Sequence, residues 1–151
     1  MAGVMFEAGG LPLGIVTAGT HVLEHQPMSI RTRAALRGLG LDIPPHRSHQ
    51  LVEADIDAAD LVIAMAGEHV RYVRRRHPAG ADRTATLPWL CRHLPDGPGS
   101  LEARVAALDL AVLDPDDQGD VEDPAGGDEA VYHACAAELA LLVAELAPRL
   151  A

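Results

Sequence analysis

One short stretch limits the possible folds of this chain more than any other: the continuous apolar run within Asp60 to Met65. A short run without polar alternation is typical of a parallel strand that is covered on both faces. Residues Gly67 to Arg76 then have the pattern of a helix, with Val70 and Val73 facing inward and three arginines at its carboxyl end. A buried strand followed by a helix indicates an α/β fold with a parallel sheet.

Other segments continue this alternation of strands and helices. We expect further strands at Gly14 to Thr17 and Thr84 to Leu87, and helices at Met1 to Gly10, Pro27 to Arg37 and Asp128 to Pro148. Pro27 suits the first position of a helix. Two sets of residues should each share one helix face: Ile30, Ala34 and Ala35 in the second helix, and Val131, Cys135, Leu139, Leu142, Val143 and Leu146 in the last. Short helical segments are expected around Trp89 and at 101–110, before an acidic loop at 114–127.

Size and charge limit the function. A chain of 151 residues fits one domain, so we expect a single domain over residues 1–151. A formal net charge of −10 leaves no basic face for phosphate neutralisation, which excludes nucleic acid as a partner. No apolar run reaches the roughly 18 to 20 residues of a membrane span, and no secretory signal is recognisable. We therefore expect a cytoplasmic protein without a membrane partner.

Neither the cysteines nor the aspartates predict a metal site. Cys91 and Cys135 stand alone in apolar patterns, without the number or spacing of a disulfide framework or a zinc site. A calcium-binding EF-hand loop beginning at Asp114 would need a glutamate at its twelfth position, where this chain has Ala125.

The stretch Asp120 to Gly127 is the most informative one for function, because it contains an Asp-Pro pair before the long carboxyl-terminal helix. A proline directly after Asp123 stiffens the loop and can hold the carboxyl group at a fixed height above a site, as a general acid requires. The spacing alone is equally typical of a solvent-exposed loop whose acids cap a helix.

The chain resembles the low-molecular-weight protein tyrosine phosphatases through an ordered series of segments. These are Thr17 to Thr20, Arg33 to Leu41, His46 to Leu51, Asp60 to Met65 and Asp123-Pro124. The resemblance implies a flavodoxin-like, three-layer parallel sheet and hydrolysis of a phosphorylated protein or a small phosphomonoester through a phosphocysteine. It implies Asp123 as general acid and Thr17 and His46 as supports of the phosphate loop, with no metal ion and no cofactor.

One part of the family pattern is missing. In the family, a cysteine, five residues and an arginine form the phosphate-binding loop, and Ser-Pro and the first helix follow. Residues Met1 to Phe6 look like the segment just after that loop, so we expect an N-terminally truncated member that lacks its first central strand and is inactive as given. The favoured explanation is a start codon chosen too late. Ala125 and Gly126 replace aromatic residues that commonly wall the phosphotyrosine ring, so a preference for phosphotyrosine does not follow.

Two alternatives remain. The first is a non-catalytic pseudophosphatase or partner-binding domain, because no nucleophile is present. The second is an arsenate reductase-like member of the same fold. Asp123-Pro124 favours the phosphatase, since reductases of this fold rely on additional redox cysteines and lack the acid loop.

Overall fold

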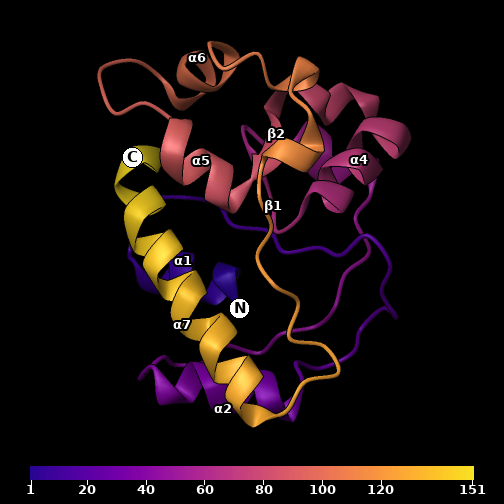
Figure 1. Cartoon of the computed structure of the whole chain (residues 1–151), viewed down its shortest axis with the longest axis vertical. Helices are drawn as coiled ribbons and strands as arrows, with labels where there is room; N and C mark the ends of the chain where they lie inside the picture. The colour runs from indigo at the N-terminus through magenta and orange to yellow at the C-terminus, as the bar shows by residue number, and fades with distance from the viewer. The chain divides into compact units, whose positions relative to one another are not determined.

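The computed structural model describes residues 1–151 and contains helices and a small parallel sheet (Figure 1). The chain divides into two compact units. The first comprises residues 1–51 and 122–147, and the second comprises residues 52–121 and 148–151. A single domain over residues 1–151 stays a prediction.

The sheet of the second unit contains strands β1 (Val62–Ala64) and β2 (Thr84–Thr86). The strands are parallel, with Val62 opposite Thr84 and Ala64 opposite Thr86. Both lie within predicted strands, although β1 is shorter than the apolar run from which it was predicted. The predicted α/β class with a parallel sheet is confirmed.

Helices follow directly at the carboxyl ends of both strands. After β1 comes α4 (Gly67–Arg76), which has the predicted bounds and buries Val70 and Val73. After β2 comes α5 (Leu87–His93), which begins where the Thr86 hydroxyl accepts a hydrogen bond of 3.3 Å from the Trp89 N–H. A threonine at this position satisfies an amide that the helix itself leaves unpaired.

The other elements of this unit are short. They are α3 (Glu53–Asp57), α6 (Leu101–Ala106) and the 3₁₀ turns η1 (Pro78–Arg83), η2 (Leu110–Val112) and η3 (Pro115–Asp117), while η4 (Ala147–Leu150) begins in the first unit and ends in the second. The sequence did not predict α3, whose start is held by a hydrogen bond of 3.0 Å from the Val52 N–H to Asp55 Oδ2. Helix α6 lies within the predicted 101–110 segment.

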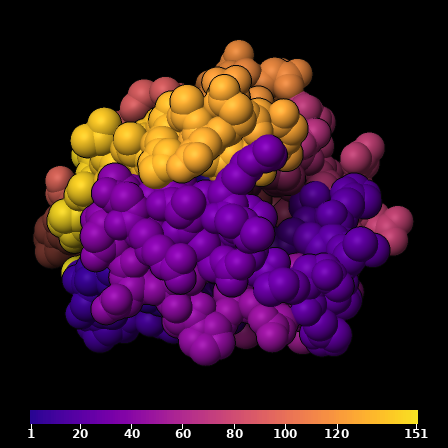
Figure 2. Space-filling model, turned by 90° about the horizontal axis from the view of Figure 1, so that it is seen from below, coloured from indigo at the N-terminus to yellow at the C-terminus, as the bar shows by residue number.

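Three helices build the core of the first unit: α1 (Ala2–Ala8), α2 (Ile30–Gly38) and α7 (Glu129–Leu146). Helix α7 packs against both α1 and α2. In Figure 2 the orange and yellow atoms of α7 lie directly on purple atoms of the α2 region. Gly38 allows this close approach, because a Cβ there would come within 2.9 Å of His133 Cε1.

Helix α7 follows the sequence prediction along most of its length, but Val131, predicted to face the core, is 37% exposed. The Asp128 side chain accepts a hydrogen bond of 3.1 Å from the Val131 N–H and so caps the helix as expected. The residues buried along it are Cys135, Ala136, Leu139, Val143 and Leu146. By length and composition alone, residues Glu129–Leu150 could cross a membrane, which the sequence reading had excluded. Core helices of soluble proteins meet the same criteria, and α7 does pack against two other helices.

Three local predictions are wrong. Gly14 to Thr17 is not a strand, because no neighbouring chain pairs with it. Helix α2 begins at Ile30 rather than at Pro27, since the Ser29 hydroxyl caps it by accepting a hydrogen bond of 3.0 Å from the Thr32 N–H. Ile30 is 77% exposed and does not face the core, whereas Ala35 and Leu36 are fully buried.

Candidate functional site

Two predicted site residues, Thr17 and His46, line the same pocket of the first unit. The pocket has a volume of about 250 Å³. Its lining residues are Met1, Gly3, Val4, Thr17, Met28, Ser29, Thr32 and His46. The structure thus brings together two residues that are far apart in sequence. The pocket lies beside the amino-terminal end of α1, where Met1 and Gly3 form one wall.

Backbone pairing explains why Thr17 and His46 meet. Gly19 and Gln50 form a parallel bridge, in which the Gly19 N–H donates to the His49 carbonyl at 2.9 Å and the Leu51 N–H donates to the Gly19 carbonyl at 2.9 Å. Pro27 and Arg47 form an antiparallel bridge further along. The segments that follow Thr17 and His46 therefore run side by side.

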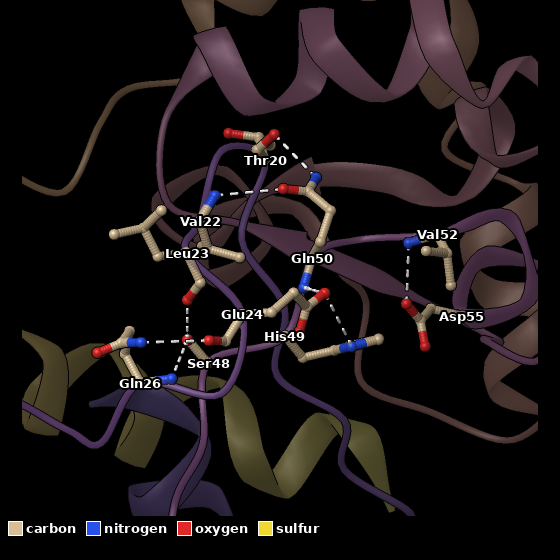
Figure 3. A network of polar contacts seen from close by, with 10 residues as sticks. All are labelled: Thr20, Val22, Leu23, Glu24, Gln26, Ser48, His49, Gln50, Val52 and Asp55. Carbon is tan, nitrogen blue, oxygen red and sulfur yellow. Dashed lines mark hydrogen bonds and ion pairs between the residues drawn. The ribbon is translucent and has the colours of Figure 1, made fainter.

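Side chains strengthen this pairing (Figure 3). The Gln50 side chain donates to the Thr20 carbonyl at 2.9 Å and accepts from the Val22 N–H at 3.2 Å. The Ser48 hydroxyl donates to the Leu23 carbonyl and accepts from the Gln26 N–H at 2.8 Å. A polar side chain on one segment thus fixes the turn of the other, which gives the 19–26 loop a defined shape.

The carboxylate of Glu24 completes this network from the loop side. It accepts a hydrogen bond of 2.8 Å from the Gln50 N–H and lies 4.0 Å from His49 Nδ1. The same carboxylate therefore contacts two consecutive residues of the opposite segment.

The Thr17 hydroxyl and the His46 ring make no hydrogen bond to another residue, whereas the His46 carbonyl accepts one of 3.0 Å from Arg47 Nη1. The Thr17 methyl group packs against α1, where a Cβ on Gly3 would overlap it. Gly3 and Thr17 both line the pocket. Burial lowers the pKa of the Met1 amino group, which belongs to the same pocket.

Asp123 stands in a tight turn before α7. Its Oδ1 accepts a hydrogen bond of 2.9 Å from the Ala125 N–H, and the Gly127 N–H donates to the Pro124 carbonyl at 2.9 Å. Gly126 has a φ of 85°, a left-handed conformation that favours glycine. The side chain is exposed, and its second carboxylate oxygen makes no hydrogen bond within the chain. Asp123 does not line the pocket of Thr17 and His46.

The other Asp-Pro pair forms the same kind of turn. Asp114 Oδ1 accepts a hydrogen bond of 3.0 Å from the Asp116 N–H. Here, however, Asp116, two residues after Asp114, forms an ion pair with Arg71 of α4. Local geometry therefore makes the two Asp-Pro pairs equivalent, and their surroundings distinguish them.

Asp120, the acidic neighbour of Asp123, has a structural partner. Its Oδ1 accepts a hydrogen bond of 2.8 Å from the Gly67 N–H at the start of α4. Sequence reasoning missed this contact, as well as the burial of Gln118 beside Thr86. No local signal could have found either, because each pairs positions more than thirty residues apart.

Both cysteines are buried and neither forms a disulfide, as predicted for core thiols. Burial raises the pKa of the Cys135 thiol, and the negative charge of Glu138 adds to the effect. A thiol with a raised pKa holds little of the thiolate that nucleophilic attack requires. No cluster of three or more histidine, cysteine or acidic side chains could hold a metal ion.

The sequence model of the family described as "Low molecular weight phosphotyrosine protein phosphatase" matches residues 1–102. Among curated proteins, a protein-arginine-phosphatase of Geobacillus stearothermophilus is 30% identical over 99% of this chain and 86% of its own length. The chain therefore belongs to the low-molecular-weight phosphotyrosine protein phosphatase family, as its motifs indicated.

Solved structures agree with this assignment. The YwlE arginine phosphatase from Geobacillus stearothermophilus has a TM-score of 0.78 and 29% identity, covering 99% of this chain and 82% of that chain. A low-molecular-weight protein tyrosine phosphatase from T. tengcongensis has a TM-score of 0.72 and 30% identity, covering 96% of this chain and 86% of that chain.

Proposed function

We propose that this chain is part of a protein phosphatase that acts through a phosphocysteine intermediate. In this mechanism Asp123 protonates the leaving group and later activates the attacking water. The observation that carries the proposal is the turn at Asp123-Pro124. One carboxylate oxygen is fixed by the Ala125 N–H, and the other remains free on an exposed loop directly before a capped helix. This arrangement holds an acid in place while leaving it accessible.

Thr17 and His46 would support the phosphate-binding loop of such an enzyme. Both residues line one pocket, and the Thr17 hydroxyl and His46 ring have no hydrogen-bond partner within the chain, so each is available to bond to such a loop. In this role the two side chains would contact the phosphate-binding loop and not the substrate.

The nucleophile is not among these residues. Six positions after Cys91 and Cys135 the chain has Gly97 and Leu141, so neither cysteine begins a loop with the required arginine. Covalent catalysis therefore needs a cysteine from outside Met1–Ala151, and we expect the chain as given to be inactive. A pseudophosphatase that binds phosphorylated partners is the alternative without catalysis.

Phosphoarginine in proteins is the second candidate substrate beside phosphotyrosine. The Geobacillus stearothermophilus relative is named a protein-arginine-phosphatase, and its similarity extends over 99% of this chain. Ala125 and Gly126 offer no aromatic wall for a phenyl ring, whereas Glu122 and Asp123 are exposed carboxylates that suit a guanidinium group.

The test uses the chain extended before Met1 by a designed apolar strand and a Cys-x5-Arg-Ser-Pro loop. Phosphoarginine and phosphotyrosine peptides are supplied as competing substrates. We expect turnover that a Cys-to-Ser change in the added loop abolishes, with a preference for phosphoarginine of at least about tenfold. A preference for phosphotyrosine would contradict the substrate assignment. A folded extended chain that turns over neither would contradict the phosphatase assignment.

A further inference from the structure

Residues 118–121 cross the carboxyl ends of both strands of the second unit. At β2, the buried Gln118 side chain accepts a hydrogen bond of 2.9 Å from the Thr86 N–H through Oε1. The Gln118 carbonyl accepts two more, from the Thr86 hydroxyl at 3.0 Å and from Arg92 Nη2 at 2.9 Å. One residue is thus held by the end of the strand and by the helix that follows it.

The same segment is held at β1 by its next residues. Asp120 Oδ1 accepts from the Gly67 N–H at 2.8 Å, and the Val121 N–H donates to the Met65 carbonyl at 2.7 Å. Ala66, at the N-cap position of α4, has no side chain that could cap the helix. A carboxylate from a distant loop therefore takes the capping role, where the helix dipole also favours a negative charge.

The side chain of Gln118 is not explained by packing alone. It is 1% exposed, and its Nε2 group has no hydrogen-bond partner. A buried amide donor without a partner is unfavourable, and an apolar side chain of similar size would avoid the cost. The carbonyl oxygen of the amide, which fixes residue 118 to β2, is the part that the fold uses.

Only a short stretch separates these anchors from the general acid. The Val121 N–H is hydrogen-bonded to the Met65 carbonyl, and Asp123 follows two residues later. Asp128 then caps α7. The acid loop, residues 122–127, therefore follows an anchor in the second unit and precedes the cap of α7 in the first unit. Its carboxyl-terminal anchor was predictable from the helix pattern, whereas its amino-terminal anchor is formed by Gln118, Asp120 and Val121.

We propose that Gln118 and Asp120 are positioning residues, which fix the start of the acid loop so that the Asp123 carboxylate has one orientation. The proposal rests on the proposed function only in naming Asp123 as the acid. Neither residue exchanges a proton with the substrate. Their effect passes through the backbone of residues 121–123.

The test measures amide order parameters of the chain itself by ¹⁵N relaxation. In the wild type, Ala125 and Gly126 should be rigid, with order parameters of about 0.85, and Asp120→Ala should lower them below roughly 0.6. Asp120→Asn keeps an acceptor oxygen of the same reach and should preserve them. Asp117→Ala is the matched control, because Asp117 lies directly before this segment, is exposed and makes no hydrogen bond through its side chain.

Gln118→Leu is the second variant, since it removes the side-chain bond from the Thr86 N–H without touching the cap of α4. It should also mobilise Ala125 and Gly126. If Asp120 only caps α4, Asp120→Ala would loosen Gly67 and Glu68 and leave the acid loop rigid. That result would overturn the proposal. So would a loop that is already mobile in the wild type. Because no turnover is measured, these outcomes are independent of whether the phosphatase assignment holds.

Discussion

Asp120 Oδ1 lies 2.8 Å from the backbone nitrogen of Gly67, across 53 positions of sequence. This one hydrogen bond joins the start of the acid loop to the start of α4. The predicted α4 has a glycine and no capping side chain at its beginning, which would be a poor start for an isolated helix. The distant carboxylate explains how the helix nevertheless begins at Gly67.

The cap contributes to stability in a measurable way. Replacement of Asp120 by Ala removes the acceptor for the Gly67 N–H, and we expect the free energy of unfolding to fall by about 1 kcal/mol, a usual value for a lost helix cap. Asp120→Asn retains an acceptor and should lose less than half as much. Urea unfolding followed by circular dichroism gives both values, and equal losses in the two variants would exclude the hydrogen bond as the cause.

Gly67 is also required for steric reasons. A Cβ at this position would lie 2.5 Å from the Pro115 carbonyl oxygen, a backbone atom that cannot move by itself. Gly67→Ala should therefore cost about 1–3 kcal/mol, as overpacked sites do. Gly14→Ala is the control, because no atom lies within 4 Å of its Cβ position. If both glycine variants unfold at the same urea concentration, the Pro115 carbonyl does not approach Gly67 as closely as the structure shows.

The two Asp-Pro pairs offer a matched comparison of the general acid. In the extended chain that carries a cysteine loop, Asp123→Ala should slow hydrolysis of substrates with poor leaving groups by about 10²–10⁴-fold. Asp114 stands in the same kind of turn, so Asp114→Ala reproduces the local change without removing the proposed acid. Steady-state rates with a series of aryl phosphates measure the difference. Loss on Asp114→Ala, with none on Asp123→Ala, would transfer the role to Asp114.

The Cys135 thiol predicts a pH dependence of stability. Burial raises its pKa in the folded protein above the ordinary value of 9.0, so the unfolded chain loses this proton first as the pH rises. The contribution to the free energy of unfolding is complete below pH 9 and declines above it. Urea unfolding between about pH 8 and pH 10.5 should show a steeper decline in the wild type than in Cys135→Ala. Parallel declines would mean that Cys135 titrates normally in the folded chain.

Sequence reasoning succeeded where a local pattern determined the outcome. The strand before Gly67, the helix after it and the Asp128 cap of α7 all depend on neighbouring residues, and all three are present, although the strand is shorter than predicted. Gly14 to Thr17 failed because a strand exists only through its partner, and composition does not say whether a partner is present. The prediction of a helix that begins at Pro27, with Ile30 facing the core, failed because α2 begins after the Ser29 cap.

The candidate site divides in the same way. Thr17, His46 and Asp123 were named from the order of family motifs, and the structure places Thr17 and His46 in one pocket but not Asp123. The roles of Gln118 and Asp120 required coordinates, since each bonds to a backbone group on a distant strand or helix. Such contacts leave no periodic trace in the sequence.

The most direct test of the central claim is an assay of para-nitrophenyl phosphate hydrolysis by the purified chain of 151 residues. In the proposed mechanism Asp123 is the general acid and the nucleophile is not among residues 1–151, so we predict no turnover above the buffer rate, with or without orthovanadate. Robust, orthovanadate-sensitive turnover that Cys91→Ser or Cys135→Ser abolishes would contradict it, because one of the two core thiols would then be the nucleophile.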